Sequence, residues 1–536
     1  MNFIEKIIKK EIEAGKHHKI VTRFPPEPNG HLHIGSAFAI NISYQMAKKF
    51  DGKFNLRFDD TNPTKEDIEY VHAIEEDFDW MGFDFGEEAY FGSDYSDKIY
   101  KYALVLIKKG LAYVCDLTQE EMRSYRGTLT EKGKNSPFRN RSVDENLDLF
   151  EKMRLGKFEE GQCVLRAKID MTSPNLYMRD PVIYRILKKH HYRTGDKWCI
   201  YPMYDYAHPI QDYIEGVTHS LCSNEFVNHR PLYEWVLNNL DLDRPLPRQI
   251  EFGRLNLTGV VTSKRYLRQL VASGVLDGWD DPRLPTLKGL KKRGVTPTMI
   301  FEFLDEIGVP KNESTIDYKL LEYFVREELK LFAPCFMTVV NPLKVVITNL
   351  KHEEPLVADN HFKDASFGKR DITLTKEIYI ERDDFSENPP AKYKRLVLGG
   401  EVRLKHGFFI KCDEVIKDDS GEIKELRCTY DPETKSGTGF TGRKVKGTIH
   451  WVSSRSREIE IRTYEDLFLE PPSDDTLIES VNPNSMLVTT GRIEEEIDRI
   501  FETGTNRFQF IRMGFYYMES KDLIHRIVSL KGTHKK

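Results

Sequence analysis

Residues 19–35 of the chain read KIVTRFPPEPNGHLHIG, and the architecture of the N-terminal half follows from them. Lys19–Arg23 has the length and apolar content of a short buried strand. Three prolines then remove backbone donors and restrict φ, so a loop must follow. From Gly35 to Lys49 the apolar spacing predicts a helix, and Lys53–Phe58 alternates in the manner of a second strand. A strand, loop, helix and strand in this order predict the start of a parallel α/β sheet.

The segment from His33 to Gly35 lies where the first strand gives way to the helix, at the carboxyl edge of the predicted sheet. Nucleotide phosphates bind at this edge in such folds, because free backbone N–H groups and the helix dipole favour anions. A histidine here can donate a hydrogen bond to a phosphate oxygen. The alternative is a histidine that only caps the helix or lies half-buried in the loop.

Two further segments carry charge suited to the same site. Asp59 and Asp60 end the second strand, where two carboxylates could hold an ammonium group; the alternative is a turn built by Asp, Thr, Asn and Pro. Far downstream, Ser263, Lys264 and Arg265 form a basic segment that we expect to be a loop able to clamp a phosphate. Its alternative is a solvated turn.

Composition restricts the class of protein. The chain has 536 residues, which is too many for one hydrophobic core, and 39% apolar with 31% charged residues is typical of a globular protein. No apolar run approaches the roughly 20 residues that span a bilayer, and no secretion signal is evident. The seven cysteines form no C-x-x-C pair, which favours a reducing cytoplasm and argues against a metal site. The net charge of −5 means that any RNA binding must come from local basic patches.

The pattern of predicted elements indicates a multidomain chain. We expect an α/β Rossmann-type parallel sheet with an inserted α+β domain, a helical domain and C-terminal antiparallel β-barrels. The predicted boundaries are 1–93 for the first half of the Rossmann domain, 94–203 for the insertion, 204–253 for the second half, 254–331 for the helical domain with the basic loop, and 332–536 for two barrels.

The His33 segment, the Asp59 segment and the Lys264 segment, taken together in this order, resemble the H-I-G-H and K-M-S-K-S motifs of class I aminoacyl-tRNA synthetases. Residues 22–35 and 55–63 closely resemble the glutamyl/glutaminyl subfamily. Further similar blocks cover nearly the whole chain; they are 126–129, 165–170, 197–205, 216–222, 278–283, 393–398 and 443–447.

The resemblance implies three groups of site residues. His33 and Lys264 would act on the ATP phosphates, within an ATP-binding set that also contains Glu27, Pro28, Asn29, Gly30, Gly35, Ser36 and Ser263. The amino acid would be bound by Arg23, Asp59, Tyr204, His208 and Cys222. The tRNA would be bound by Leu129, which would open the acceptor stem, by Asn228, and at the anticodon by Lys392, Lys394, Arg395, Gln509 and Arg512.

The resemblance also implies the reaction. We expect ATP-dependent activation of L-glutamine and its transfer to the 2′-OH of the terminal adenosine of tRNA-Gln, with release of AMP and pyrophosphate. Mg²⁺ would enter with ATP, without a dedicated protein site. Charge builds on phosphate oxygens in this reaction, so positioned cations matter more than an acid or a base. The partners would include neither DNA nor a membrane, and the chain would be a monomer.

Several positions depart from the family pattern. Ser36 stands where H-I-G-H has its second histidine, which predicts slower activation, although the hydroxyl can still donate a hydrogen bond and suits a helix start. Thr262 replaces a methionine, Asn228 an aspartate and Cys335 an arginine, while Lys392 stands where a relative has glutamine. Loss of an arginine removes a fork of donors, so anticodon recognition should differ in detail.

Substrate choice depends on few residues. Cys222 stands where glutamyl enzymes of the archaeal and eukaryotic type carry arginine, and a neutral side chain favours an amide over an unpaired carboxylate. Three alternatives stay open: a glutamate-tRNA ligase, a tRNA-binding paralogue with weakened catalysis, and a nucleotidyl transferase without tRNA. Basic residues in strand-like sequence favour an RNA-reading surface, although a solvated strand face has the same pattern. They are Lys392, Lys394, Arg395, Arg443 and Lys444.

Overall fold

The computed structural model describes residues 1–64 and 66–532. The chain divides into two compact units. The first comprises Met1–Thr258, Thr262–Arg268 and Leu304–Ile316. The second comprises Gly259–Val261, Gln269–Phe303 and the chain from Asp317 onward. In the part of the chain that is described, no helix combines the length and the apolar character needed to cross a membrane.

The first unit begins with the parallel sheet that the sequence predicts. Strand β1 (Val21–Phe24) pairs in parallel with β2 (Lys53–Phe58), and β2 with β3 (Tyr90–Phe91). Helix α2 (Ile34–Lys49) connects the first two strands, so the predicted strand, loop, helix and strand are confirmed. A second parallel pair, β8 (His219–Ser223) with β9 (Arg248–Phe252), lies beside β1, because the Thr218 N–H donates to the Val21 carbonyl over 2.9 Å.

Helices flank these strands in the first unit. They are α1 (Phe3–Glu13), α3 (Ile68–Met81), α7 (Tyr204–Ile214) and α8 (Arg230–Asn239). Strand β10 (Leu255–Thr258) pairs with β11 (Ser314–Asp317). The stretch between them contains α9 (Lys264–Ala272), α10 (Leu287–Arg293) and α11 (Pro297–Ile307), and α12 (Lys319–Phe332) follows β11.

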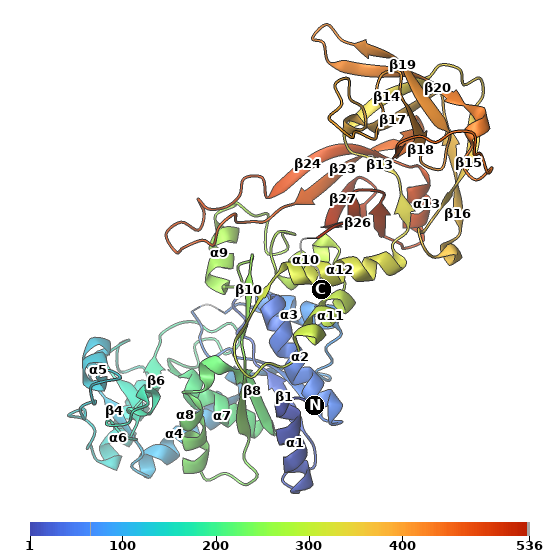
Figure 1. Ribbon diagram of the computed structural model, residues 1–536. Helices are drawn as coiled ribbons and strands as arrows, with labels where there is room; N and C mark the ends of the chain where they lie inside the picture. The colour runs from blue at the N-terminus through green and yellow to red at the C-terminus, as the bar shows by residue number, and fades with distance from the viewer. Residues whose placement is uncertain (65, 533–536) are drawn as a thin grey trace. The chain divides into compact units, whose positions relative to one another are not determined.

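Between β3 and α7 the chain forms an antiparallel sheet, and its core is continuous with buried side chains of α7 and α8. Its strands are β4 (Ala112–Cys115), β5 (Val164–Ala167), β6 (Val182–Ile186) and β7 (Ile200–Pro202). Helices α4 (Ser96–Lys108) and α6 (Val143–Arg154) bury apolar side chains against it, while α5 (Gln119–Arg126) has no buried residue. Figure 1 shows these elements gathered at one end of the first unit.

Two seven-stranded sheets dominate the second unit (Figure 1). One contains β12 (Cys335–Phe336), β13 (Thr338–Val339), β23 (Arg457–Tyr464), β24 (Met486–Ile493), β25 (Arg507–Phe510), β26 (Gly514–Ser520) and β27 (Leu523–Ser529). The other contains β14 (Pro342–Ile347), β17 (Glu377–Glu381), β18 (Glu401–Leu404), β19 (Phe409–Lys417), β20 (Ile423–Asp431), β21 (Thr448–Ile449) and β22 (Trp451–Ser453). A hairpin of β15 (Glu354–Asp359) and β16 (Lys369–Leu374), and helix α13 (Glu496–Glu502), complete this part.

The sheets of the second unit correct one detail of the prediction. Most ladders are antiparallel, as expected, but four strand pairs in the described chain are parallel: β12 with β25, β14 with β20, β18 with β21, and β23 with β27. Each of these pairs joins strands far apart in the sequence. Alternation of apolar residues reports only the buried face of a strand, so it could not have revealed the direction of the neighbour.

Candidate active site

The proline-rich loop after β1 is tied to the end of β2. The Asp59 N–H donates to the Pro26 carbonyl (2.9 Å), and the Asp67 N–H donates to the Pro28 carbonyl (3.0 Å). Within the loop, the Asn29 N–H donates to the Glu27 carbonyl (2.9 Å). Neighbouring parallel strands end at the same edge of a sheet, so these bonds place the ATP-binding candidates beside the Asp59 carboxylate.

His33 caps helix α2 and also keeps a nitrogen suited to an anion. Its Nδ1 accepts a hydrogen bond from the Gly35 N–H (3.1 Å), and the Ser36 hydroxyl oxygen accepts from the His33 N–H (3.4 Å). Burial lowers the pKa of His33 to about 3, assisted by the positive charges of Lys264 and Arg254, so the ring is neutral. Since Nδ1 is the acceptor, the proton of the neutral ring lies on Nε2. His33 is thus a cap and a candidate hydrogen-bond donor at once.

Lys264 lies beside the proline-rich loop. It is the first residue of helix α9, so the expectation that Lys264 and Arg265 belong to a loop is wrong. The Lys264 Nζ donates to Asn29 Oδ1 (3.0 Å) and to the Glu27 carbonyl (3.5 Å). Burial lowers the pKa of Lys264, and the nearby Arg268 guanidinium acts in the same direction. Ser263 precedes the helix with its side chain exposed.

The two aspartates at the end of β2 have different environments. Asp59 is buried and accepts a hydrogen bond from the Thr61 hydroxyl (2.9 Å). Burial raises the pKa of Asp59 to about 6, and the Glu27 and Asp60 carboxylates raise it further. Asp60 instead accepts from the Ser93 N–H (2.7 Å), the Ser93 hydroxyl (2.6 Å) and Tyr192 (3.2 Å). The expected pair of ammonium-binding carboxylates therefore reduces to Asp59, because Asp60 is occupied within the protein.

The predicted amino-acid-binding residues Arg23 and His208 belong to a buried charged network. Arg23 Nε donates to Asp212 Oδ1 (3.2 Å) and its Nη1 to the Leu221 carbonyl (2.9 Å). Arg57 Nη2 donates to the same Asp212 oxygen (2.9 Å) and lies 2.9 Å from His208 Nδ1. The two guanidiniums hold the pKa of Asp212 well below its ordinary range against the opposing effect of burial.

Three of the amino-acid-binding candidates, Tyr204, His208 and Cys222, are uncharged. Tyr204, the first residue of α7, stacks on the ring of His208 with 4.8 Å between centroids and 17° between planes. Burial lowers the pKa of His208 well below its ordinary value, and burial raises the pKa of the Cys222 thiol to about 12. At neutral pH all three side chains are therefore neutral.

Sequence reasoning missed three residues of this site: Arg57, Asp212 and Glu66. The Glu66 Oε1 accepts from the Asn62 N–H (2.8 Å), and burial raises the pKa of Glu66 to about 9, assisted by the neighbouring carboxylates of Asp60 and Asp59. The sequence did contain one indication of these residues: Arg57 and Asp212 are charged residues within an otherwise apolar strand or helix. It could not have shown that both meet one histidine.

Leu129 is exposed on a loop that is held firmly. Its side chain is 78% exposed, and the loop follows α5. The Arg179 Nη1 donates to the carbonyls of Arg126 (2.8 Å), Thr128 (2.9 Å) and Glu131 (2.8 Å).

In the same unit, Asn228 is also exposed, and its carbonyl accepts from Asn175 Nδ2 (2.8 Å).

The basic residues predicted for the anticodon lie in loops, not in strands as expected. Lys392, Lys394 and Arg395 lie in the connection between η5 (Arg382–Asp384) and β18, and Arg443 and Lys444 precede β21. A side chain on Gly447 would meet the Lys394 carbonyl at 1.6 Å, so only glycine allows this approach of the two loops. Gln509 lies on β25 opposite Cys335, whose thiol lies 3.5 Å from Gln509 Oε1.

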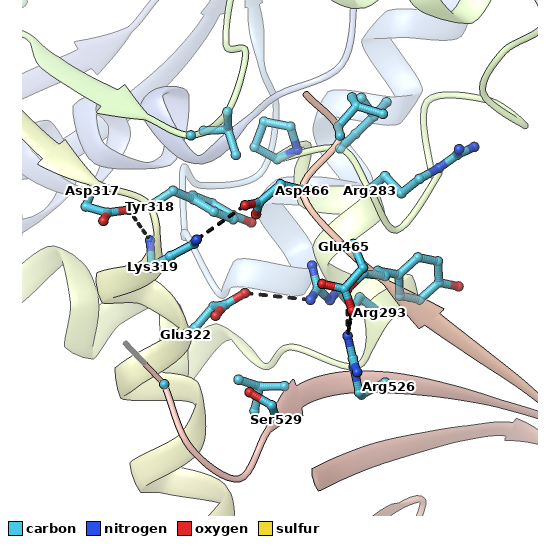
Figure 2. A pocket seen from close by; sticks show the side chains of 18 of the residues that line it. Arg283, Arg293, Asp317, Tyr318, Lys319, Glu322, Glu465, Asp466, Arg526 and Ser529 are labelled. Atoms are coloured by element: carbon cyan, nitrogen blue, oxygen red, sulfur yellow. Dashed lines mark hydrogen bonds and ion pairs between the residues drawn. The ribbon is translucent and has the colours of Figure 1, made fainter. Parts of the chain in front are cut away.

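A cavity of about 260 Å³ in the second unit was not predicted (Figure 2). Charged side chains from α10, α12 and the segments around β23 and β27 line part of it. Ion pairs cross its wall: Arg526 with Glu465 (2.5 Å), Lys319 with Asp466 (3.3 Å) and Arg293 with Glu322 (3.8 Å). Because these cations have carboxylate partners, the wall is charged without a strong excess of either sign.

The chain matches known families along most of its length. The family model for the catalytic domain of class I tRNA synthetases (E and Q) matches residues 19–331. Two models for the anti-codon binding domain of the same group match residues 333–431 and 448–519. The chain therefore belongs to the E and Q family of class I tRNA synthetases, and it is an aminoacyl-tRNA synthetase.

The relatives within this family are more specific. The chain is 56% identical to the glutamine-tRNA ligase of Clostridium perfringens, covering 100% of this chain and 98% of the relative. It is 53% identical to the glutamine-tRNA ligase of Clostridioides difficile with the same coverage. Among solved structures, the glutamate-tRNA synthetase of Elizabethkingia anophelis is 19% identical with a TM-score of 0.44, covering 59% of this chain and 72% of that chain.

Proposed function

We propose that this chain is a glutamine-tRNA ligase that activates L-glutamine with ATP and transfers it to the 2′-OH of the terminal adenosine of tRNA-Gln. AMP and pyrophosphate are the other products. The observation that carries the proposal is that the Lys264 ammonium lies 3.0 Å from Asn29 in the loop after β1, whose backbone is bonded to Asp59. A phosphate-binding cation and an ammonium-binding carboxylate thus meet at one sheet edge.

In the activation step, the carboxylate of the amino acid attacks the α-phosphate and charge builds on the phosphate oxygens. The neutral His33 ring donates from Nε2, Lys264 supplies a positive charge, and the N-terminal N–H groups of α2 add donors. Mg²⁺ enters as part of the ATP substrate. Glu27, Pro28, Asn29 and Gly30 form the floor under the adenylate, with Gly35, Ser36 and Ser263 close to the phosphates.

Choice of the amide over the acid follows from charge balance. Asp59 takes the ammonium of the amino acid. The Arg23 guanidinium is compensated by Asp212 (3.2 Å), and Tyr204, His208 and Cys222 are neutral. A glutamate side chain would place a carboxylate in this pocket without a free cation to pair with it. An unpaired buried charge of this kind costs ~3–5 kcal/mol.

The tRNA contacts are assigned to both units. Residues 94–203 bind the acceptor stem, where exposed Leu129 separates the terminal base pair and Asn228 contacts the stem. Residues 332–536 read the anticodon with Lys392, Lys394, Arg395, Gln509 and Arg512. The enzyme works in the cytoplasm as a monomer.

Charging assays test the proposal. Purified protein is incubated with ATP, Mg²⁺, separated tRNAs and either radiolabelled glutamine or glutamate. We expect glutamine to enter tRNA-Gln and the kcat/KM for glutamate to be roughly 10²–10⁴-fold lower, which corresponds to the cost of an unpaired buried charge. Efficient charging with glutamate, or no charging of any tRNA, would overturn the assignment.

A further inference from the structure

Three segments of the second unit meet at one buried carboxylate, that of Asp384. Asp384 is the last residue of η5 and has no exposed surface. Arg512 Nη1 donates to its Oδ2 and Arg512 Nη2 to its Oδ1, both over 2.8 Å, which is a bidentate pair. Arg395 Nη1 lies 2.9 Å from the same Oδ1. One carboxylate therefore holds two arginines that come from distant parts of the chain.

The backbone around Asp384 supports the same arrangement. The Leu396 N–H donates to the Asp384 carbonyl (2.9 Å), and the Ser386 N–H donates to the Leu396 carbonyl (3.1 Å), so the ends of the basic loop are joined. The Asp383 carbonyl accepts from Arg395 Nη1 (3.2 Å). The loop that contains Lys392, Lys394 and Arg395 is thus closed directly over Asp384.

Arg512 has a backbone conformation that requires support. Its φ is +70°, in the left-handed region that side chains other than glycine rarely adopt. A residue stays there only when its surroundings fix it, and such residues gather at binding sites. The bidentate pair with Asp384 is shorter than the 3.3 Å contact of Arg512 with His450, so it fixes where this guanidinium points.

Burial separates the roles of the three side chains. The carboxylate of Asp384 is fully buried, whereas the side chains of Arg395 and Arg512 are 41% and 31% exposed. An RNA can therefore reach the guanidiniums but not the carboxylate. Both guanidiniums keep exposed surface that can meet a polyanion.

We infer that Asp384 is a positioning residue for tRNA recognition: it orients Arg395 and Arg512 toward the anticodon without touching the RNA. The inference rests on the proposed function, because the ligand of the two arginines is taken to be the anticodon loop. A purely structural ion pair would stabilise the fold but leave anticodon discrimination unchanged.

The test compares Asp384→Asn with Asp383→Asn, which removes the same charge from an exposed neighbour. We expect Asp384→Asn to raise KM for tRNA-Gln roughly tenfold to a hundredfold, while KM for glutamine and ATP changes less than about twofold. The preference for tRNA-Gln over a transcript with one altered anticodon base should shrink by a similar factor. Asp383→Asn should behave as the wild-type protein, and Asp384→Glu should restore part of the affinity.

Equal KM values for tRNA in Asp384→Asn and Asp383→Asn, or unchanged anticodon discrimination, would overturn the inference. If Asp384→Asn does not fold, Arg395→Gln and Arg512→Gln are made singly and together. A shared carboxylate predicts that their effects on KM for tRNA are not additive, whereas additive effects would contradict it. Failure of the wild-type protein to charge tRNA would instead refute the proposed function.

Discussion

Each compact unit contains two arginines on a buried aspartate, but the two clusters differ in exposure. In the first unit, Arg23 and Arg57 are 1% and 0% exposed. They share Asp212, and Arg57 also donates to Glu215 (3.1 Å). Around Asp384 in the second unit, Arg395 and Arg512 stay partly exposed. Asp384 and, to a smaller degree, Glu381 raise the pKa of Arg512.

The difference matches what each surface would bind in the proposed function. A closed cluster whose charges are compensated can support a neutral pocket for an amide, because it leaves no cation for a carboxylate ligand. An open cluster whose guanidiniums reach the surface can attract RNA. The same residue types thus serve opposite purposes, and burial decides which. Substitutions at each cluster can test this contrast.

The largest effect is expected at the closed cluster. Asp212→Asn leaves Arg23 and Arg57 buried with one carboxyl group fewer, and breaking a buried pair in this way costs about 3–5 kcal/mol. We expect the free energy of unfolding in urea to fall by that amount, and by clearly less in Asp384→Asn, whose arginines can reach water. Tyr233→Phe, which removes only a 2.9 Å hydrogen bond to Asp212, is the matched mild variant. Equal losses at the two aspartates would contradict the contrast.

The next effect concerns the cation of the ATP site. Lys264→Ala removes a charge from the developing transition state and should lower kcat for glutamine activation by roughly 10²–10³-fold. The KM for tRNA should change little, because Lys264 is a nucleotide contact in the proposed mechanism. Pyrophosphate exchange in the presence of tRNA measures the first quantity and charging assays the second. Lys264→Arg, which keeps a positive charge at this position, serves as the control, and an equal loss there would argue against charge as the role of Lys264.

A pH profile tests the ammonium site. Asp59 must be ionised to bind the amino acid, and its pKa is raised to about 6. As pH falls through this value the carboxylate is protonated, so kcat/KM for glutamine should fall about tenfold per unit below pH 6. Binding of tRNA should show no such step from this residue. The Asp59→Asn variant should have low activity, and its kcat/KM should not fall further below pH 6. A fall below pH 6 that persists in this variant would mean that another group causes it.

The smallest effect is expected at Ser36. Its hydroxyl accepts from the His33 N–H over 3.4 Å, a long bond within the capping box of α2. Ser36→Ala should cost at most ~1 kcal/mol of stability. Ser36→His restores an imidazole at this position and should raise the activation rate severalfold, measured by pyrophosphate exchange. An unchanged rate would remove the interpretation of Ser36 as the cause of slower activation.

Prediction from sequence was most successful where structure is local. Residues 19–58 gave strand, loop and helix because proline restriction and apolar period act over a few residues. Prediction failed where one sequence pattern is compatible with two structures. Lys264 and Arg265 have the pattern of a basic loop, but they begin a helix. The basic residues near 392–395 and 443–444 alternate like strand residues, yet they lie in loops. The Cys222 thiol is neutral, as expected, because burial raises its pKa.

The sequence alone determined the family, the order of the motifs and the chemistry that each motif can perform, since these depend on residue type and spacing. Tertiary structure decided that Asp60, and not its neighbour Asp59, is bonded to Ser93 and Tyr192, which come from distant positions in the chain. It also decided that Arg23 is closed in a compensated cluster while Arg512 stays open. Burial and pairing arise only when remote segments meet, and these two quantities set the charge that a ligand encounters.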